Sequence, residues 1–326
     1  MIQNTSYQIL PFLDSLKATR LDIVFKPTVH AEQKAWLGAA VRNRFLFACE
    51  SVKTNDGVSL REAFNVCPLD KSHFLYKQYA DGFPKCFVWN VAGAHPRTKG
   101  FAFKDSKEYT MSLFVFGFAS QWIDEIKLAI RRMMLMGLGS NPAPLELVDI
   151  IVHEPFSLEN FAKHIHTKPV LLTIQTQTPL SLLKYREESS DGFQKKMNGF
   201  PAFYQIVRTC VSRLATLNLL YAENNDIWST FDSQEKWSLS IDGLSNAASS
   251  AWLQSAEIKN VVAYGTPKQN TDTVYRFSGY VGELTFSNVD ALLVPIVNMM
   301  GTLGIGNDVS YGLGFYNVNI RQYGNK

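Results

Sequence analysis

Apolar and polar residues alternate along the first predicted strand. Residues 19–26 (TRLDIVFK) place their apolar members on one side, which is the period-two pattern of a half-buried strand. Residues 31–49 instead repeat apolar positions at helical spacing, so a helix is predicted there. The same patterns predict strands over 85–91 and 109–116, a helix over 120–136 and a strand over 145–152. The first half is therefore predicted as strand, helix, strand, strand, helix, strand.

The second half repeats this order. The predicted elements are a strand over 170–176, a helix over 202–221, strands over 261–264 and 274–286, a helix over 289–300 and a strand over 315–321. Residues 223–254 are polar and weakly patterned. The two halves also share a short similarity, because MMLMGLG at Met133 to Gly139 aligns with MMGTLGIG at Met299 to Gly306 after one insertion. Such repeats indicate duplication of one unit.

The repeated order β-α-β-β-α-β is that of the ferredoxin-like, or RNA-recognition-type, module. We therefore predict an α+β protein built from two tandem ferredoxin-like domains. The first domain is predicted to span residues 1–155, and the second spans residues 168–326 and carries a glycine-rich loop. Sheets of this kind commonly present RNA-binding surfaces, although the fold alone does not assign a function.

The glycine-rich loop reads GTLGIGNDVSYGLGFY over residues 301–316, with two Gly-x-Gly pairs around a polar turn. Glycines at this spacing let a tight backbone present N–H groups to phosphate oxygens. The predicted phosphate-binding residues are Gly304, Gly306, Asn307, Ser310, Gly312 and Gly314. The loop follows a predicted helix and precedes a strand, whereas a dinucleotide-binding fingerprint runs from strand to helix as G-x-G-x-x-G. This order disfavours a phosphate-cofactor enzyme.

Composition supports a folded protein with a mild preference for anions. The 326 residues are 46% hydrophobic, which is enough for two cores, and the net charge is +3. Residues 1–150 carry 18 Lys and Arg against 14 Asp and Glu, so an anionic partner is expected on the first half. The four cysteines have no C-x-x-C spacing, and no secretory or membrane-spanning segment is recognised. We therefore expect a cytoplasmic protein with reduced thiols, no metal and no cofactor.

The C-terminal block resembles a known family. Residues 277–286 (FSGYVGELTF), followed by the glycine-rich loop, are similar to the terminal strand and loop of the CRISPR-associated endoribonucleases called Cas six, which cut precursor CRISPR RNA within its repeats. Further similarity lies in LFVFG at 113–117, GLG at 137–139, TPL at 178–180 and WLGAAVRNRF at 36–45.

The resemblance implies a metal-independent endoribonuclease that binds CRISPR repeat RNA. In such enzymes the 2′-hydroxyl attacks the adjacent phosphate and leaves a 2′,3′-cyclic phosphate and a 5′-hydroxyl. The implied partners are precursor and mature guide RNA and other Cas proteins of an effector complex. A non-cleaving guide-RNA-binding subunit of the same lineage is the alternative. The catalytic residues of the family vary, so none is transferred to this chain.

The candidate catalytic pair is His30 and Lys34. His30 is predicted to start the first helix, and Lys34 follows one turn later on the same face. Histidine can accept or donate a proton near neutral pH, and a lysine can stabilise the charge of the transition state. An exposed histidine at a helix start is the equally open alternative. His153 has no distinguishing context.

The predicted RNA-binding residues are cationic. They lie on the first helix, in the basic connection AGAHPRTKGFAFKDSK and on the long helix of the second half, and they are Arg42, Arg44, His95, Arg97, Lys99 and Arg208. For the basic connection, a solvated loop without RNA contact is the alternative.

Overall fold

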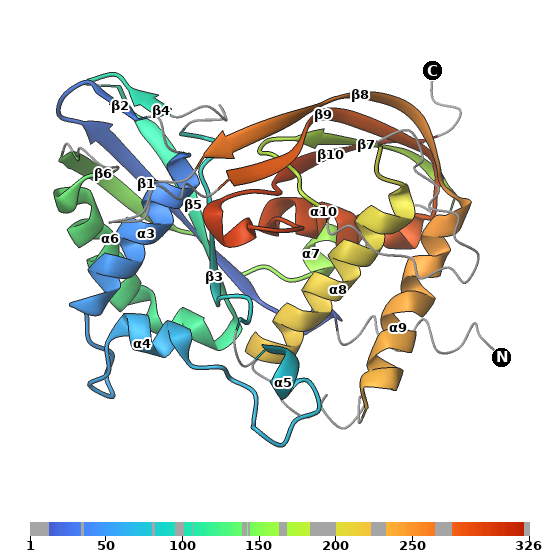
Figure 1. The fold of residues 1–326 in the computed structure, drawn as a ribbon, viewed down its shortest axis with the longest axis horizontal. Helices are drawn as coiled ribbons and strands as arrows, with labels where there is room; N and C mark the ends of the chain where they lie inside the picture. Colours follow the sequence, from blue (N-terminus) through green and yellow to red (C-terminus); the bar gives the residue numbers. More distant parts are fainter. Residues whose placement is uncertain are drawn as a thin grey trace.

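Two four-stranded antiparallel sheets, each covered by helices, make up the protein (Figure 1). The structure is a computed structural model. It describes residues 13–33, 36–79, 82–94, 101–105, 107–138, 142, 144–162, 168–182, 200–222, 233–264 and 276–322. The blue-to-green first module and the yellow-to-red second module lie side by side, so the predicted α+β fold of two tandem ferredoxin-like modules is confirmed.

The first sheet has the strand order β3-β5-β1-β6. Its strands are β1 (Ala18–Pro27), β3 (Phe87–Asn90), β5 (Tyr109–Phe116) and β6 (Leu145–Val152). Counted along the chain within the module, the order is second, third, first, fourth, which is the ferredoxin-like topology. The two crossover helices are α3 (Leu37–Glu50) and α6 (Ile123–Met136).

The first module carries additional short elements. They are the two-stranded sheet of β2 (Ala31–Gln33) with β4 (Phe101–Phe103), the helices α4 (Leu60–Asn65) and α5 (Tyr76–Tyr79), the 3-10 helix η1 (Gly117–Trp122) and, after β6, the helix α7 (Glu159–Ala162).

The second sheet repeats the topology with the order β10-β7-β9-β8. Its strands are β7 (Val170–Thr176), β8 (Trp252–Tyr264), β9 (Arg276–Val289) and β10 (Tyr316–Gln322), and its helices are α8 (Phe203–Tyr221), α9 (Gln234–Asn246) and α10 (Val294–Leu303). Short 3-10 helices are η3 (Ala247–Ser250), η4 (Ala291–Leu293) and η5 (Val309–Tyr311). Identical strand orders in both modules agree with duplication of one unit.

One face of the first sheet packs against α3. The ring of Phe45 on α3 meets the ring of Trp89 on β3 edge-on, at 5.2 Å between centroids. Successive side chains of a strand point to opposite faces, so Asn90 points away from α3. Asn90 pairs with Ser112 of β5, and Ser112 pairs with Asp22 of β1. This polar row therefore lies on the face opposite α3, which we call the open face. Part of this face is covered, because Phe114 packs against Phe156 and Phe116 against Tyr221.

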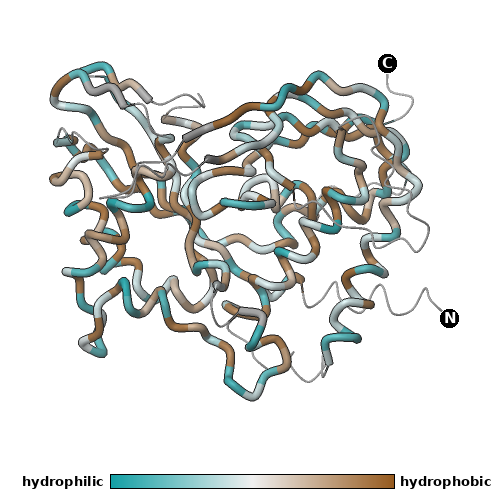
Figure 2. The backbone as a smooth tube through the Cα atoms, in the orientation of Figure 1, coloured by the Kyte–Doolittle hydropathy of each residue, from teal (hydrophilic) through white to brown (hydrophobic). Residues whose placement is uncertain are grey.

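The cores of the modules are apolar and continuous. Figure 2 shows hydrophobic segments along β5 and α10, and side chains of both elements are buried. In the part of the chain that the structure describes, no helix is long and apolar enough to cross a membrane.

Three predicted elements differ from the structure. The helix expected over 31–49 begins only at Leu37, because residues 31–33 form β2 and pair with β4. The region 223–254 contains α9, and the strand expected over 261–264 begins at Trp252. The helix expected over 289–300 is displaced to 294–303, since β9 continues to Val289.

Candidate nucleic-acid interface

The glycine-rich loop lies between the two modules, and its part outside α10 and β10 is residues 304–315. It connects α10 to β10, and its backbone meets the N-terminal end of α3. The indole Nε1 of Trp36 donates a hydrogen bond of 2.6 Å to the carbonyl oxygen of Tyr311. A Cβ atom added to Gly38 would lie 1.9 Å from the same oxygen, so only glycine permits this approach. The loop is thus docked onto the first module by direct backbone contact.

The N–H groups of Gly312 and Gly314 are used within the protein, which corrects the predicted phosphate cradle. Gly312 N–H donates to the carbonyl oxygen of Val309 and Gly314 N–H to that of Pro179, both at 2.9 Å. Both glycines are buried and have positive φ values of 78° and 79°. The expectation was wrong here because these glycines serve tight turns and close packing.

The first glycine pair also packs closely against protein atoms. Gly304 is buried, with a φ of 77° at the end of α10. A Cβ on Gly306 would lie 2.0 Å from the carbonyl oxygen of Ser181, and the next N–H, of Asn307, donates to that oxygen at 2.7 Å. The backbone N–H of Asn307 is therefore used within the protein, whereas phosphate binding by the N–H groups of Gly304 and Gly306 stays a prediction.

The tip of the loop is accessible. Asn307 and Asp308 are exposed, and Ser310 is half-buried. Asp308 adopts the left-handed conformation with a φ of 60°, which Asp tolerates better than most residues. The tip can therefore offer side-chain amide and hydroxyl groups to a ligand.

A cationic site adjoins this tip. The guanidinium carbon of Arg42 on α3 lies 4.5 Å from the centre of the Tyr311 ring, a cation–π arrangement. The Nε atom of Arg42 is buried and has no hydrogen-bond partner among the described residues. Burial, and then the positive charge of Arg42, lower the pKa of Lys85 at the start of β3. Two cations that influence each other in this way create a positive potential that favours anions.

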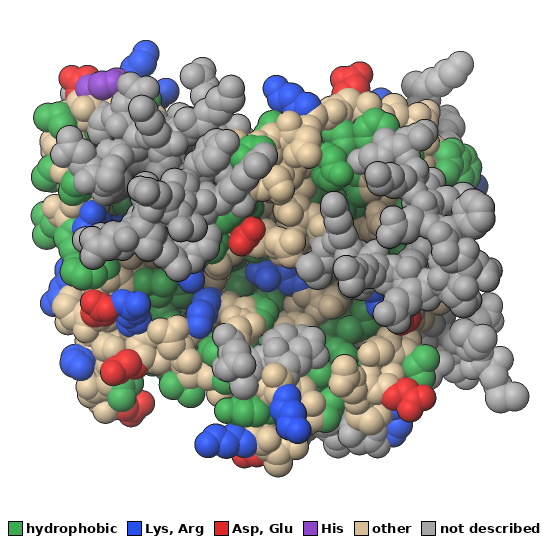
Figure 3. Space-filling model, viewed as in Figure 1, with side chains coloured by type: hydrophobic (Ala, Val, Ile, Leu, Met, Phe, Trp, Pro, Cys, Tyr) green, Lys and Arg blue, Asp and Glu red, His purple; other side chains and the backbone are tan. Residues whose placement is uncertain are grey.

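Figure 3 shows where cationic side chains gather. In this view, Lys and Arg side chains lie in the middle of the molecule, in the recess between the modules where α3 approaches the segment that connects α10 to β10.

The structure places the predicted catalytic and helical residues in different surroundings. His30 is exposed in the turn between β1 and β2, so it does not start the helix as expected; the reason is that residues 31–33 pair with β4. Arg44 lies about 200° around α3 from Arg42, because each helical residue turns by about 100°. Arg208 on α8 donates through Nε to Asp242 on α9 at 2.7 Å.

Four predicted site residues lie outside the described part of the chain: Lys34, His95, Arg97 and Lys99. Among the described residues, no group of three or more His, Cys, Asp or Glu side chains is placed to hold a metal. Burial raises the pKa of the Cys86 and Cys210 thiols to about 12, so both are unreactive at neutral pH.

A second polar cluster lies on the open face of the first sheet and was missed in the sequence. Asp22 accepts hydrogen bonds from Arg20 Nε at 2.7 Å, Ser112 Oγ at 2.6 Å and His153 Nε2 at 2.8 Å. Burial tends to raise the pKa of Asp22, but these hydrogen bonds outweigh it, and the pKa lies below its ordinary value. The only sequence sign was Arg20 and Asp22 on the polar side of a strand.

The fold is that of Cas6 proteins. A partial Cas6-RT-Cas1–Cas2 complex matches with a TM-score of 0.56 and 13% identity over 95% of this chain, which corresponds to 47% of that chain. Two different Cas6 product complexes match with TM-scores of 0.51 and 0.50, both at 11% identity, over 94% and 93% of this chain and nearly the whole of theirs. No family model and no curated protein matches the sequence.

Proposed function

We propose that this protein binds CRISPR repeat RNA and cleaves precursor CRISPR RNA without a metal ion. The observation that carries the proposal is the shared architecture: the tandem fold of Cas6 product complexes recurs over nearly the whole chain. The cationic site of Arg42 beside the loop tip supports it, since arginine suits phosphate recognition. The sheets of such modules commonly bind single-stranded RNA.

The proposed reaction is attack of a ribose 2′-hydroxyl on the adjacent phosphorus. The oxygen–phosphorus bond to the next nucleotide breaks, and the products are a 2′,3′-cyclic phosphate and a 5′-hydroxyl. A base must remove the hydroxyl proton, an acid must protonate the leaving oxygen, and cations must stabilise the charged transition state. We assign the proton transfer to His30 and charge stabilisation to Lys34. The exposure of His30 supports the first assignment, since it leaves the imidazole accessible to RNA.

One observation favours a second candidate function. His30 lies on the turn before β2, whereas Arg42 and Tyr311 meet at the contact between α3 and the loop. A protein without proton-transfer groups at the bound phosphate would hold RNA without cutting it. The alternative is therefore a non-cleaving subunit that binds guide RNA within an effector complex. In either case we propose other Cas proteins as partners, as in the Cas6-RT-Cas1–Cas2 assembly.

The deciding experiment uses the purified protein and the repeat RNA of its own CRISPR locus in the presence of EDTA. We expect cleavage at one position, with a 2′,3′-cyclic phosphate on one product and a 5′-hydroxyl on the other. Products with a 5′-phosphate, or activity abolished by chelation, would contradict the mechanism. Tight binding without any cleavage would establish the guide-RNA-binding alternative.

A further inference from the structure

We propose that Arg20 and His153, held in place by Asp22, form a binding site for the phosphodiester backbone of single-stranded RNA. The site lies on the open face of the first sheet. It rests on the proposed function, RNA binding, and adds where a second part of the RNA is held. The contact at Arg42 and Tyr311 is made by different elements, α3 and the glycine-rich loop.

Strand pairing fixes the position of the cluster. Asp22 of β1 lies opposite Ser112 of β5 on one side and opposite Ile151 of β6 on the other. The backbone N–H of His153 donates to the carbonyl oxygen of Arg20 at 2.9 Å, which holds the histidine at the end of β6 beside β1. The side chains of Arg20, Asp22 and His153 therefore meet on β1 and at the end of the adjacent strand β6, beside Ser112 of β5.

The cluster buries its negative charge and leaves the Arg20 and His153 side chains partly exposed. The side chain of Asp22 is 12% exposed, whereas those of Arg20 and His153 are each 43% exposed. Both oxygens of Asp22 accept hydrogen bonds from within the cluster. The terminal NH₂ groups of Arg20 make no hydrogen bond within the described part of the chain. A guanidinium with free terminal donors is suited to a phosphate group, and the carboxylate keeps it oriented.

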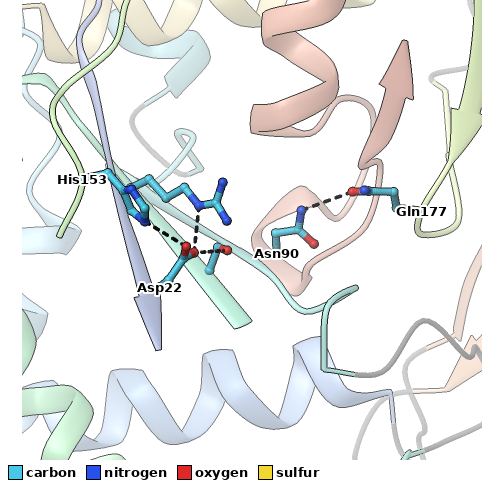
Figure 4. A network of polar contacts seen from close by, with 6 residues as sticks. Asp22, Asn90, His153 and Gln177 are labelled. Carbon is cyan, nitrogen blue, oxygen red and sulfur yellow. Dashed lines mark hydrogen bonds and ion pairs between the residues drawn. The ribbon is translucent and has the colours of Figure 1, made fainter. Parts of the chain in front are cut away.

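Neighbouring amides extend the site towards the second module. Asn90 Nδ2 lies 3.4 Å from Gln177 Oε1, and Gln177 Nε2 donates to Asn317 Oδ1 at 3.0 Å. Figure 4 shows Asn90 between the Asp22 cluster and Gln177. Side-chain amides bind ribose and base edges, while cations bind phosphates, so this order of groups suits a nucleic-acid strand that crosses between the modules.

One nearby carboxylate sets the direction of approach. Asp149 of β6 lies on the same face opposite Val24, one row from Asp22, and accepts a hydrogen bond from the N–H of Ile150 at 2.7 Å. Its charge disfavours a phosphate on that side. The RNA backbone is therefore expected to pass on the side of Arg20 and Asn90, away from Asp149.

The test measures binding of a 12-nucleotide oligouridylate to the full chain by fluorescence anisotropy over a series of salt concentrations. Arg20→Gln should weaken binding about tenfold through loss of a charged hydrogen bond. It should also reduce the slope of log K against log salt by about 0.7, the value for one phosphate contact in a single strand. The matched control is Lys127→Gln on α6, a cation paired with Asp124, which should leave the slope unchanged.

Thermal unfolding must show that each variant is folded. If Arg20→Gln fails to fold, His153→Gln provides the measurement, since it leaves the Arg20–Asp22 pair intact and should still weaken binding. If the folded Arg20→Gln variant has the affinity and salt slope of the unchanged protein, the proposed site is wrong. The same holds for a folded His153→Gln variant measured in its place. Failure of the unchanged protein to bind oligouridylate would also overturn the site. The unchanged protein could also bind oligouridylate with a salt slope that depends on Arg20 and yet fail to cut repeat RNA. That result would support the site and refute the proposed cleavage.

Discussion

Gly38 on α3 and Tyr311 in the glycine-rich loop are in direct backbone contact, although they are 273 residues apart in the sequence. The contact exists because residue 38 has no Cβ, and it is reinforced by the hydrogen bond from the Trp36 indole to the Tyr311 carbonyl. A Cβ on Gly312 would lie 3.4 Å from the Cα of Gly38. Glycines from both modules thus let the two backbones approach closely.

Replacement of Gly38 by alanine should separate the modules at this contact. The added Cβ would lie 1.9 Å from a backbone oxygen, so the backbone must shift. Overpacking of this kind typically lowers the free energy of unfolding by about 1–3 kcal/mol. The measurement is chemical unfolding of Gly38→Ala beside Gly82→Ala. A Cβ at residue 82 meets no atom of the described residues within 4 Å, so that control should remain near the parent. Equal stability of the two variants would contradict a tight contact at Gly38.

Gly312→Val should lose stability and RNA binding together. Residue 312 has a φ of 78°, a conformation in which a β-branched residue is strained. Its Cβ would also approach the carbonyl oxygen of Trp89 to 3.1 Å. Unfolding and repeat-RNA affinity should be measured on the same preparation. A fully stable Gly312→Val that has lost RNA binding would instead restore the phosphate-cradle interpretation.

Arg42 should contribute to RNA binding through an orientation set by Tyr311. Arg42→Gln is expected to weaken repeat-RNA binding, and Tyr311→Leu should do so to a smaller degree by removing the aromatic surface. Tyr311→Phe keeps the ring and serves as the control. A half-buried cation–π pair contributes about 0.5–2 kcal/mol, so a double-mutant cycle should yield a coupling energy in that range. Full additivity of the two losses would show that the stacking has no role.

The Asp22 cluster should make stability depend on pH. Because the folded-state pKa of Asp22 lies below its ordinary value, its contribution is complete above the unfolded-state pKa of about 4 and is lost as pH falls through the folded-state pKa. Asp22→Asn should therefore be less stable than the parent at pH 7, by about 1.5–3 kcal/mol for hydrogen bonds to a charged group. Denaturant unfolding should show this difference shrinking below pH 4; a constant difference down to pH 2 would argue against an ionised Asp22.

His30→Ala tests the proposed acid–base group. Loss of such a group should slow single-turnover cleavage by about 10²–10⁴-fold while repeat-RNA binding remains nearly unchanged. His73→Gln is the matched control, since His73 lies in a different part of the first module, between α4 and α5. An unchanged cleavage rate in His30→Ala would remove His30 from the mechanism and strengthen the guide-RNA-binding alternative.

The duplicated module could be predicted because its buried elements have strong periodic patterns. The elements that could not be predicted have weak hydrophobic patterns, and each has a physical reason. The strand β8 lies at the edge of its sheet with many exposed side chains, so it shows little alternation. The helix α9 buries a narrow stripe of Trp237, Ile241 and Leu244 in an otherwise polar stretch. The three residues of β2 are too few to show any period.

The candidate site was harder to predict because its contacts are between distant residues. Arg42 was identified from its charge, but its position against Tyr311 depends on the docking of the two modules. His153 had no recognisable context, since its partner Asp22 is 131 residues away. The glycine-rich loop was located correctly, yet its hydrogen bonds to Pro179 and Ser181 could be seen only in the folded chain.

The edge position of β10 has a consequence for the order of assembly during synthesis. The first module is complete once β6 has been made, but β7 has no partner on one side until β10, the last strand of the second sheet, has been translated. Domains generally fold as units while the chain emerges, and at usual elongation rates this interval is on the order of ten seconds. During that time the N-terminal end of α3, where Trp36 and Gly38 contact Tyr311, is not covered by the glycine-rich loop. Docking of the modules through the glycine-rich loop therefore follows the synthesis of β10, and the RNA-binding surface that we propose across the modules cannot form before translation has passed β10.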